Sequence, residues 1–139
     1  MNIKKQLFHS NKTLGYDLIR IYLGLGLFLK GIQFITTPTI ITDLMAGSQL
    51  VVLPMIIIHY ISLAHLAGGL MLAIGILTRI AAMIQVPILF GATFFINIKY
   101  GLLSTHQQFE FSALVLFLLI IFSLFGPGNL SIDKGVHQK

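Results

Sequence analysis

The sequence predicts an all-α, polytopic membrane protein, built as an antiparallel bundle of four transmembrane helices. Three observations indicate this class. Of the 139 residues, 56% are hydrophobic and only 9% are charged, whereas a soluble domain has about 25% charged residues. Four apolar runs approach the roughly 20 residues that a helix needs to cross a hydrocarbon core of about 30 Å. Most Lys and Arg residues lie near the ends of these runs, as in the flanks of membrane helices.

The first span is expected at residues 14–35, after a basic N-terminal segment, residues 1–13. A signal peptide is the alternative interpretation of an apolar segment near the start of a chain. This segment is too long for one, carries Arg20 and Lys30, and is followed by no small-residue cleavage site. We therefore expect a helix that stays in the membrane.

The second and third spans are expected at residues 51–77 and 80–98. Only Thr78 and Arg79 separate them, which predicts a very tight turn and two antiparallel neighbouring helices. Pro87 lies near the middle of the third span, where a proline removes one helical hydrogen bond and favours a kink.

The fourth span is expected at residues 109–125, and the Gly-Pro-Gly sequence at residues 126–128 ends it. Residues 14–126 then form one transmembrane domain, and residues 127–139 form a C-terminal tail. We find no tandem repeat and no low-complexity tract that would indicate a second domain.

The distribution of basic residues predicts the orientation in the membrane. Only Lys99 flanks the spans on one side, and the other flanking basic residues share the opposite side: Lys4, Lys5, Lys12, Arg79, Lys134 and Lys139. The positive-inside rule then places both termini in the cytoplasm of a bacterial inner membrane. The net charge of +5 does not indicate nucleic-acid binding, because these residues do not gather on one polar face with aromatic residues between them.

Ionisable residues inside a span are costly, so they mark either a partner or a function. Asp17 and Arg20 lie within two turns of the cytoplasmic end of the first span, and their spacing of three residues predicts an ion pair on one helix face. The structural interpretation is a topology anchor, since an Arg near a helix end can also extend to the membrane surface.

A second group of polar residues belongs to the outer half of the membrane and predicts a polar pocket that opens outward. These candidate ligand-binding residues are Lys30, Gln33, His65, Asn97 and Glu110. Gln85 adds uncharged polarity in the third span. The competing interpretation is structural: Lys30 and Glu110 form a buried pair that holds helices together, while Asn97 and Glu110 lie at the headgroups.

The histidines do not form a haem or metal site. His59 and His65 share one helix and point roughly 120° apart, whereas two axial ligands must face each other. Neither a second His nor a carboxylate lies three or four residues from His65, so no metal ligand set is expected. The chain has no cysteine, which excludes thiolate ligands and disulfides. Quinone is the one cofactor left open.

Three segments of the chain, between Leu14 and Asp133, resemble the DoxX family of small four-helix membrane proteins. "LIRIYLGLGLFLKGIQFI" resembles the first span of that family, with its Arg, its spaced glycines and a Lys-Gly near the end. "HLAGGLMLAIGILTRIAA" resembles the second span and the turn that follows it. "FEFSALVLFLLIIFSLFGPGNLSID" resembles the fourth span, with Glu110 and a closing pattern made by Gly126, Gly128, Ser131 and Asp133.

The resemblance implies four transmembrane helices and an association with redox systems, because some relatives are subunits of a thiosulfate:quinone oxidoreductase. Where the family commonly has a Glu before the Gly-Gly of the second span, this chain has His65. An imidazole keeps the hydrogen-bonding ability of the acid. Its charge differs, because burial favours the neutral ring unless Glu110 is close.

Three functions follow from these features. The first is an accessory subunit of a membrane redox system, with a quinone or a small apolar ligand in the outward pocket. The second is a non-catalytic membrane scaffold or assembly partner. The third is a small-molecule carrier, although the chain shows no discontinuous helix pair or internal repeat. Expected partners are the lipid bilayer and other membrane or redox subunits, and a homo-oligomer is also allowed. No nucleophile–base pair, phosphate loop or metal cluster indicates catalysis, so enzyme status stays open.

Overall fold

The computed structural model describes residues 3–40, 43, 55–101, 105 and 107–133, and only the helical backbone for residues 3–12. Its long helices are α1 (Ile3–Thr36), α3 (Met55–Ile74), α4 (Thr78–Gly91) and α5 (Gln108–Phe125), and the described residues contain no strand. Four helical segments are long and apolar enough to cross a membrane: Thr13–Thr36, Ile56–Ile74, Thr78–Tyr100 and Gln108–Phe125. The all-α membrane fold is therefore confirmed. Residues 51–54 of the predicted second span lie outside the described residues.

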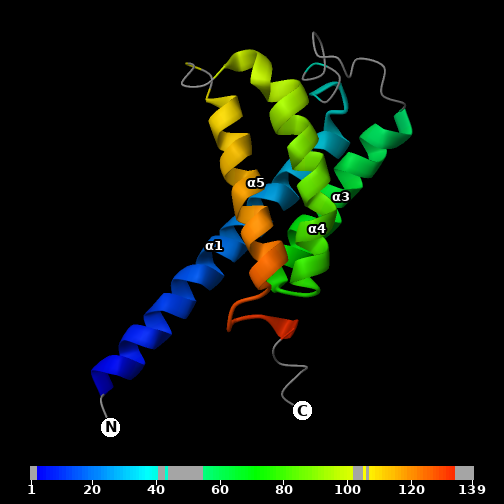
Figure 1. Cartoon of the computed structure of the whole chain (residues 1–139). Helices are drawn as coiled ribbons and strands as arrows, with labels where there is room; N and C mark the ends of the chain where they lie inside the picture. Colours follow the sequence, from blue (N-terminus) through cyan, green and yellow to red (C-terminus); the bar gives the residue numbers. More distant parts are fainter. Residues whose placement is uncertain (1–2, 41–42, 44–54, 102–104, 106, 134–139) are drawn as a thin grey trace.

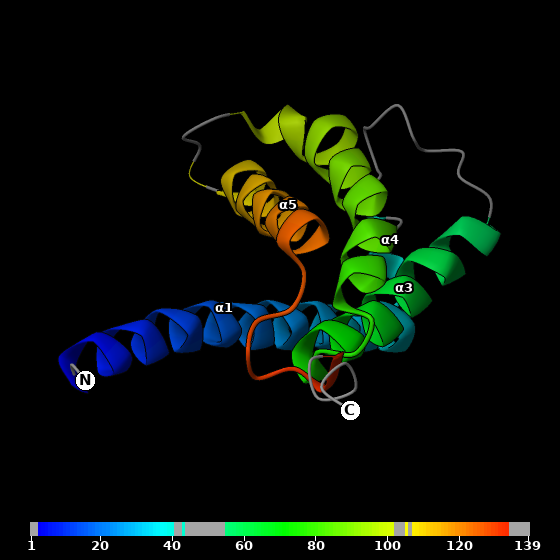
Figure 2. The ribbon, with the colours of Figure 1, turned by 60° about the horizontal axis from the view of Figure 1, so that its bottom comes forward.

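The helices are arranged as two pairs that share one end. α1 packs along α3, α4 packs along α5, and the turn between α3 and α4 joins the pairs (Figures 1 and 2). The end of the bundle that holds this turn and residues 126–133 is the turn end. The opposite end, which holds Thr36 and the first residues of α3 and α5, is the loop end. The N-terminal part of α1 extends beyond the other helices at the turn end (Figure 2).

The turn between α3 and α4 falls three residues earlier than the sequence predicts. Gly75 and Leu77 have positive φ angles of 80° and 47°, and the N–H of Gly75 donates to the carbonyl of Met71. A left-handed glycine is a common helix end, because it has no Cβ to clash with the reversed backbone. Thr78 is therefore the first residue of α4 rather than part of the turn.

α4 changes its helical geometry toward the loop end. Pro87 lies inside the helix, as expected, and the α-helical part ends at Gly91. A π-helix, Ala92–Ile96, and a 3-10 helix, Asn97–Tyr100, carry the same segment on to the loop end. A proline removes one backbone hydrogen bond, and π-helical turns are uncommon in regular helices and frequent at functional sites.

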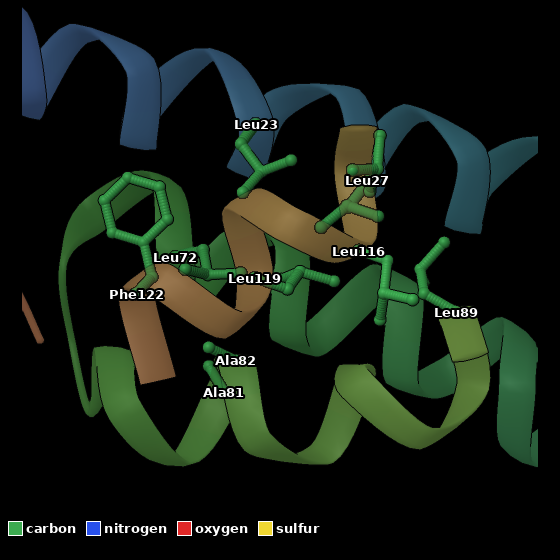
Figure 3. Packing of buried hydrophobic residues seen from close by; sticks show 10 residues of the cluster. Leu23, Leu27, Leu72, Ala81, Ala82, Leu89, Leu116, Leu119 and Phe122 are labelled. Atoms are coloured by element: carbon green, nitrogen blue, oxygen red, sulfur yellow. The ribbon is translucent and has the colours of Figure 1, made fainter. Parts of the chain in front are cut away.

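The apolar core lies where all four helices meet, toward the turn end (Figure 3). Leu72 of α3, Ala82 of α4 and Leu119 of α5 have no exposed surface. The small side chain of Ala82 leaves room for neighbouring helices to come close. The core contains Leu23, Leu27, Leu72, Ala81, Ala82, Leu89, Val115, Leu116, Leu119 and Phe122.

Glycines bring α1 and α3 into backbone contact. A Cβ on Gly24 would lie 2.7 Å from the carbonyl oxygen of Gly69 and would meet the backbone of Ala73. A Cβ on Gly31 would meet the backbone of Leu66, and one on Gly69 would meet α1 in turn. Gly24 and Gly31, seven residues apart on one face of α1, are close-packing positions, as in the small-residue pattern of membrane helix pairs.

The outer surface of this bundle differs from that of a soluble protein. Large apolar side chains such as Tyr22, Ile56 and Phe125 are exposed, which suits contact with lipid tails. Several of the best-buried side chains are instead polar: Asp17, Arg20, Ser62, His65, Thr78, Gln85, Thr93 and Ser112. Because these groups have left water, their hydrogen-bond partners decide what each one does.

Candidate functional site

The turn end contains a buried ion pair. Asp17 and Arg20 of α1 are both 0% exposed, with a guanidinium nitrogen 3.6 Å from the Asp17 carboxylate. Arg20 also donates to the carbonyl of Leu72 over 3.2 Å and to the carbonyl of Leu130 over 2.6 Å. Asp17 accepts from the N–H of Leu130 over 3.0 Å. Arg20 thus points into the protein rather than to the membrane surface, and the pair together binds both backbone groups of one residue.

A second carboxylate closes the same end. Asp133 accepts from the N–H groups of Leu77 and Thr78, over 2.8 and 3.0 Å. Its own N–H donates to the carbonyl of Gly75 over 3.1 Å. Residue Leu77 gives α4 no side-chain cap, so Asp133 supplies the cap from 55 residues away. A carboxylate at a helix N-terminus satisfies free N–H groups and complements the helix dipole.

Three glycines allow this arrangement. A Cβ on Gly128 would collide with the Asp17 carboxylate, and a Cβ on Gly75 would collide with the Arg20 guanidinium. Gly126 has a φ of 78°, and its carbonyl accepts from the Tyr16 hydroxyl over 2.8 Å. We call this assembly the clasp: Asp17, Arg20 and Asp133 with the backbone of residues 75–78 and 126–131.

His65 is the buried imidazole among the predicted site residues. Its side chain is on the α3 face that meets α1, and the residue is 5% exposed. Nδ1 lies 2.9 Å from the carbonyl of Ile61. Because a carbonyl oxygen can only accept, Nδ1 carries a proton, and when the ring is neutral Nε2 is then an acceptor. The ring meets the edge of Phe34 at a centroid distance of 5.5 Å.

Lys30 and Gln33 are neighbours of Phe34 on α1. Lys30 Nζ donates to Gln33 Oε1 over 3.2 Å, and both side chains are exposed. The same Nζ is 5.8 Å from the centroid of the Phe34 ring. The α1–α3 pair therefore brings Lys30, Gln33 and His65 together around one aromatic ring. This group, which we call the imidazole site, offers donors, an acceptor and an apolar surface.

Asn97 and Glu110 belong to the other helix pair. Asn97 begins the 3-10 helix after α4, and Glu110 lies in the first turn of α5, where a carboxylate complements the helix dipole. Both residues are half-buried. The loop ends of α1 and α5 lie apart in both views of the bundle (Figures 1 and 2). Lys30 forms its hydrogen bond with Gln33 of its own helix, rather than acting as a link between helices.

Gln85 is a buried polar residue that the sequence analysis left outside the candidate set. It is 0% exposed, and within the described part of the chain neither atom of its amide group has a hydrogen-bond partner. Its spacing could have identified it, because Gln85 shares the inward face of α4 with Thr78, Ala82 and Leu89. No three His, Asp or Glu side chains among the described residues lie together as a metal site.

Comparison with known proteins yields one match. The family model described as DoxX matches residues 15–98. The matched segment contains Arg20, Lys30, His65 and Gln85, and it ends before Glu110. No curated protein matches the chain, and no solved structure does.

Proposed function

Starting from the fact that this chain belongs to the DoxX family, we propose that it is an accessory subunit of a membrane redox system. In this role it binds a quinone or a similar small apolar ligand at the imidazole site. The observation that carries the proposal is His65: an imidazole buried in a membrane-spanning helix, whose own helix engages Nδ1.

The chemistry of the imidazole site suits a ligand that is apolar but carries oxygen. Ligand sites in proteins are mostly apolar, with a few polar groups that fix orientation. Nε2 of neutral His65 accepts a hydrogen bond from a hydroxyl, such as that of a quinol. Phe34 supplies the adjoining ring surface, and the Lys30 ammonium supplies a donor at the exposed rim.

The redox role and the orientation rest on other features of the chain. The family resemblance connects such chains to quinone-using enzymes as subunits. Exposed apolar side chains on α5, among them Phe111, Phe117 and Leu124, suit contact with lipid or with a membrane-embedded partner. The basic flanks favour a bacterial inner membrane, with the turn end and both termini in the cytoplasm. The imidazole site then lies toward the outer face.

A titration tests the ligand part of this proposal. The chain in lipid nanodiscs is titrated with a short-tailed benzoquinone and with its quinol. His65→Leu is expected to weaken quinol binding by about tenfold, which corresponds to one hydrogen bond. His59→Leu is the matched control, because His59 is exposed on the same helix, and its variant should bind as the wild type does. Absence of binding to the wild-type chain would contradict the proposal.

The clasp favours a second candidate function, that of a non-catalytic scaffold or assembly partner. Its three charged residues, of which Asp17 and Arg20 are buried, are explained by holding α1, the α3–α4 turn and residues 126–133 together. A scaffold predicts that His65→Leu lowers thermal stability and leaves the assembly with partner subunits intact. Co-purification of the variant with membrane partners, beside the quinol titration, separates the two functions.

A further inference from the structure

The amide group of Gln85 is a feature of the bundle that helix packing does not explain. The residue lies in the α-helical part of α4 and is 0% exposed. Both Oε1 and Nε2 are buried, and neither has a hydrogen-bond partner within the described residues. A buried amide without partners is costly, so such a group in a native protein calls for a specific explanation.

Several other buried polar side chains in the helices satisfy themselves locally, although the Thr78 hydroxyl also has no hydrogen-bond partner within the described residues. Ser62 donates to Ile58 over 2.9 Å, and Thr93 donates to Leu89 over 2.7 Å, each within its own helix. His65 does the same through Nδ1. Short side chains can fold back onto the carbonyl four residues earlier. The longer stem of Gln85 carries its amide away from α4.

The amide of Gln85 occupies the place that a side chain at Gly68 would take. A Cβ on Gly68 would lie 2.8 Å from Nε2 of Gln85. Gly68 follows His65 by three residues, so the two positions are neighbours on one flank of α3, about one helical turn apart. The unpartnered amide therefore lies over α3 about one helical turn from His65, whose ring contacts Phe34 of α1.

The helix backbones around this position separate toward one end of the bundle. α3 and α4 diverge from their shared turn toward the loop end in both views (Figures 1 and 2). Gln85 lies two helical turns above the turn, near the base of the divergence. Rotation of its flexible side chain away from Gly68 vacates the space over this glycine, which a ligand group can then occupy.

We propose that Gln85 is the second polar contact of the ligand at the imidazole site, and that it binds one oxygen of an apolar ligand entering between α3 and α4. The inference rests on the proposed function. An amide both donates and accepts, so Nε2 serves a carbonyl oxygen and Oε1 serves a hydroxyl. His65 Nε2 accepts only. Gln85 therefore contacts the oxidised and the reduced form of the ligand alike, whereas His65 favours the form with a hydroxyl.

The test compares two variants with both ligand forms in lipid nanodiscs. Gln85→Met keeps the length of the side chain and removes the amide. It is expected to bind the short-tailed benzoquinone and its quinol each about tenfold more weakly, whereas His65→Leu weakens chiefly the quinol. Thr93→Val is the control, because Thr93 lies in the π-helix that follows α4 and its hydroxyl donates to the carbonyl of Leu89. An alkylbenzene of the same size, which has no oxygen, should bind Gln85→Met and the wild type equally.

The outcomes separate this inference from the proposed function. A wild type that binds neither form contradicts both. If the wild type binds, and Gln85→Met binds both forms as tightly as the wild type does, only the role of Gln85 is overturned. Circular dichroism measures the helix content of each variant. If Gln85→Met does not fold, Gln85→Leu is used to repeat the measurement. In the absence of ligand, Gln85→Met and Gln85→Leu should each unfold at a temperature no lower than the wild type does, since neither change removes a protein hydrogen bond.

Discussion

Two regions of the bundle treat polar groups in opposite ways. At the turn end, Asp17, Arg20 and Asp133 each bind backbone groups that come from distant parts of the chain. At the contact between α3 and α4, Gln85 has no such partner among the described residues. Burial of a polar residue in a membrane helix therefore does not by itself indicate a binding site. The partners of its atoms decide between structure and binding.

The C-terminal segment, residues 128–133, supplies the hydrogen-bond partners that the clasp has and Gln85 lacks. Residues 128–133 fold back beneath the core and supply the N–H and C=O groups that Asp17 and Arg20 need. These contacts span more than 100 residues of sequence. Ligand sites need the opposite property, because a group already satisfied by the protein contributes little to binding. The substitutions below test this contrast between the clasp and the α3–α4 contact.

The largest effect is expected from Arg20→Met. This change leaves the Asp17 carboxylate buried without its cation, and breaking one partner of a buried pair costs about 3–5 kcal/mol. Thermal unfolding in detergent, followed by circular dichroism, should show a strongly destabilised bundle. The double variant Asp17→Asn with Arg20→Met should recover part of the loss. A single variant as stable as the wild type would contradict the clasp.

Gly24→Ala and Gly26→Ala form a matched pair two residues apart on α1. The added methyl at Gly24 meets the backbone of α3, so a loss of about 1–3 kcal/mol in the free energy of unfolding is expected. At Gly26 nothing lies within 4 Å, and alanine should stabilise the helix by about 0.5–1 kcal/mol. Equal effects at the two sites would show that α1 and α3 do not cross where the structure has them.

A smaller effect is expected from Asp133→Ala. The variant removes the cap of α4 but no apolar contact of the core, so a loss of about 1 kcal/mol is expected. Ile132→Ala is the control, since Ile132 is exposed and surface changes stay within about 0.5 kcal/mol. Denaturant unfolding of both variants in detergent measures the difference, and a larger loss for Ile132→Ala would refute the capping role.

The smallest effect is expected from Lys30→Met. Lys30 is exposed and bonds Gln33 within its own helix, and exposed polar pairs contribute little to stability. The unfolding temperature should stay within a degree or two of the wild type, roughly the shift that a few tenths of a kcal/mol produces. A large loss of stability would mean that Lys30 has a structural partner at the loop end.

The sequence was sufficient for features that depend on local composition. Hydropathy predicts four spans, and the seven-residue spacing of Gly24 and Gly31 predicts a close helix contact, which the backbone contacts of both residues with α3 confirm. The three-residue spacing of Asp17 and Arg20 predicts a pair on one face of a helix. Each of these follows from helix geometry alone.

Features that depend on distant contacts were beyond the sequence. The burial of Arg20 depends on residues 128–131, which lie more than 100 positions away. Grouping Glu110 with Lys30 assumed that all four helices converge at the loop end, whereas α1 and α5 separate there. The sequence shows Gln85 as uncharged polarity in the third span and gives no reason to place it in the candidate set. In three dimensions its amide is set apart because both polar atoms are buried without a hydrogen-bond partner among the described residues.

Thermal unfolding of Gln85→Met, with and without saturating benzoquinone, tests the central claim most directly. The claim is that the amide of Gln85 serves a ligand rather than the fold. We expect a variant at least as stable as the wild type without the quinone, and a smaller rise in unfolding temperature when the quinone is added. A variant that is less stable on its own, yet gains as much from the quinone as the wild type, would contradict the claim.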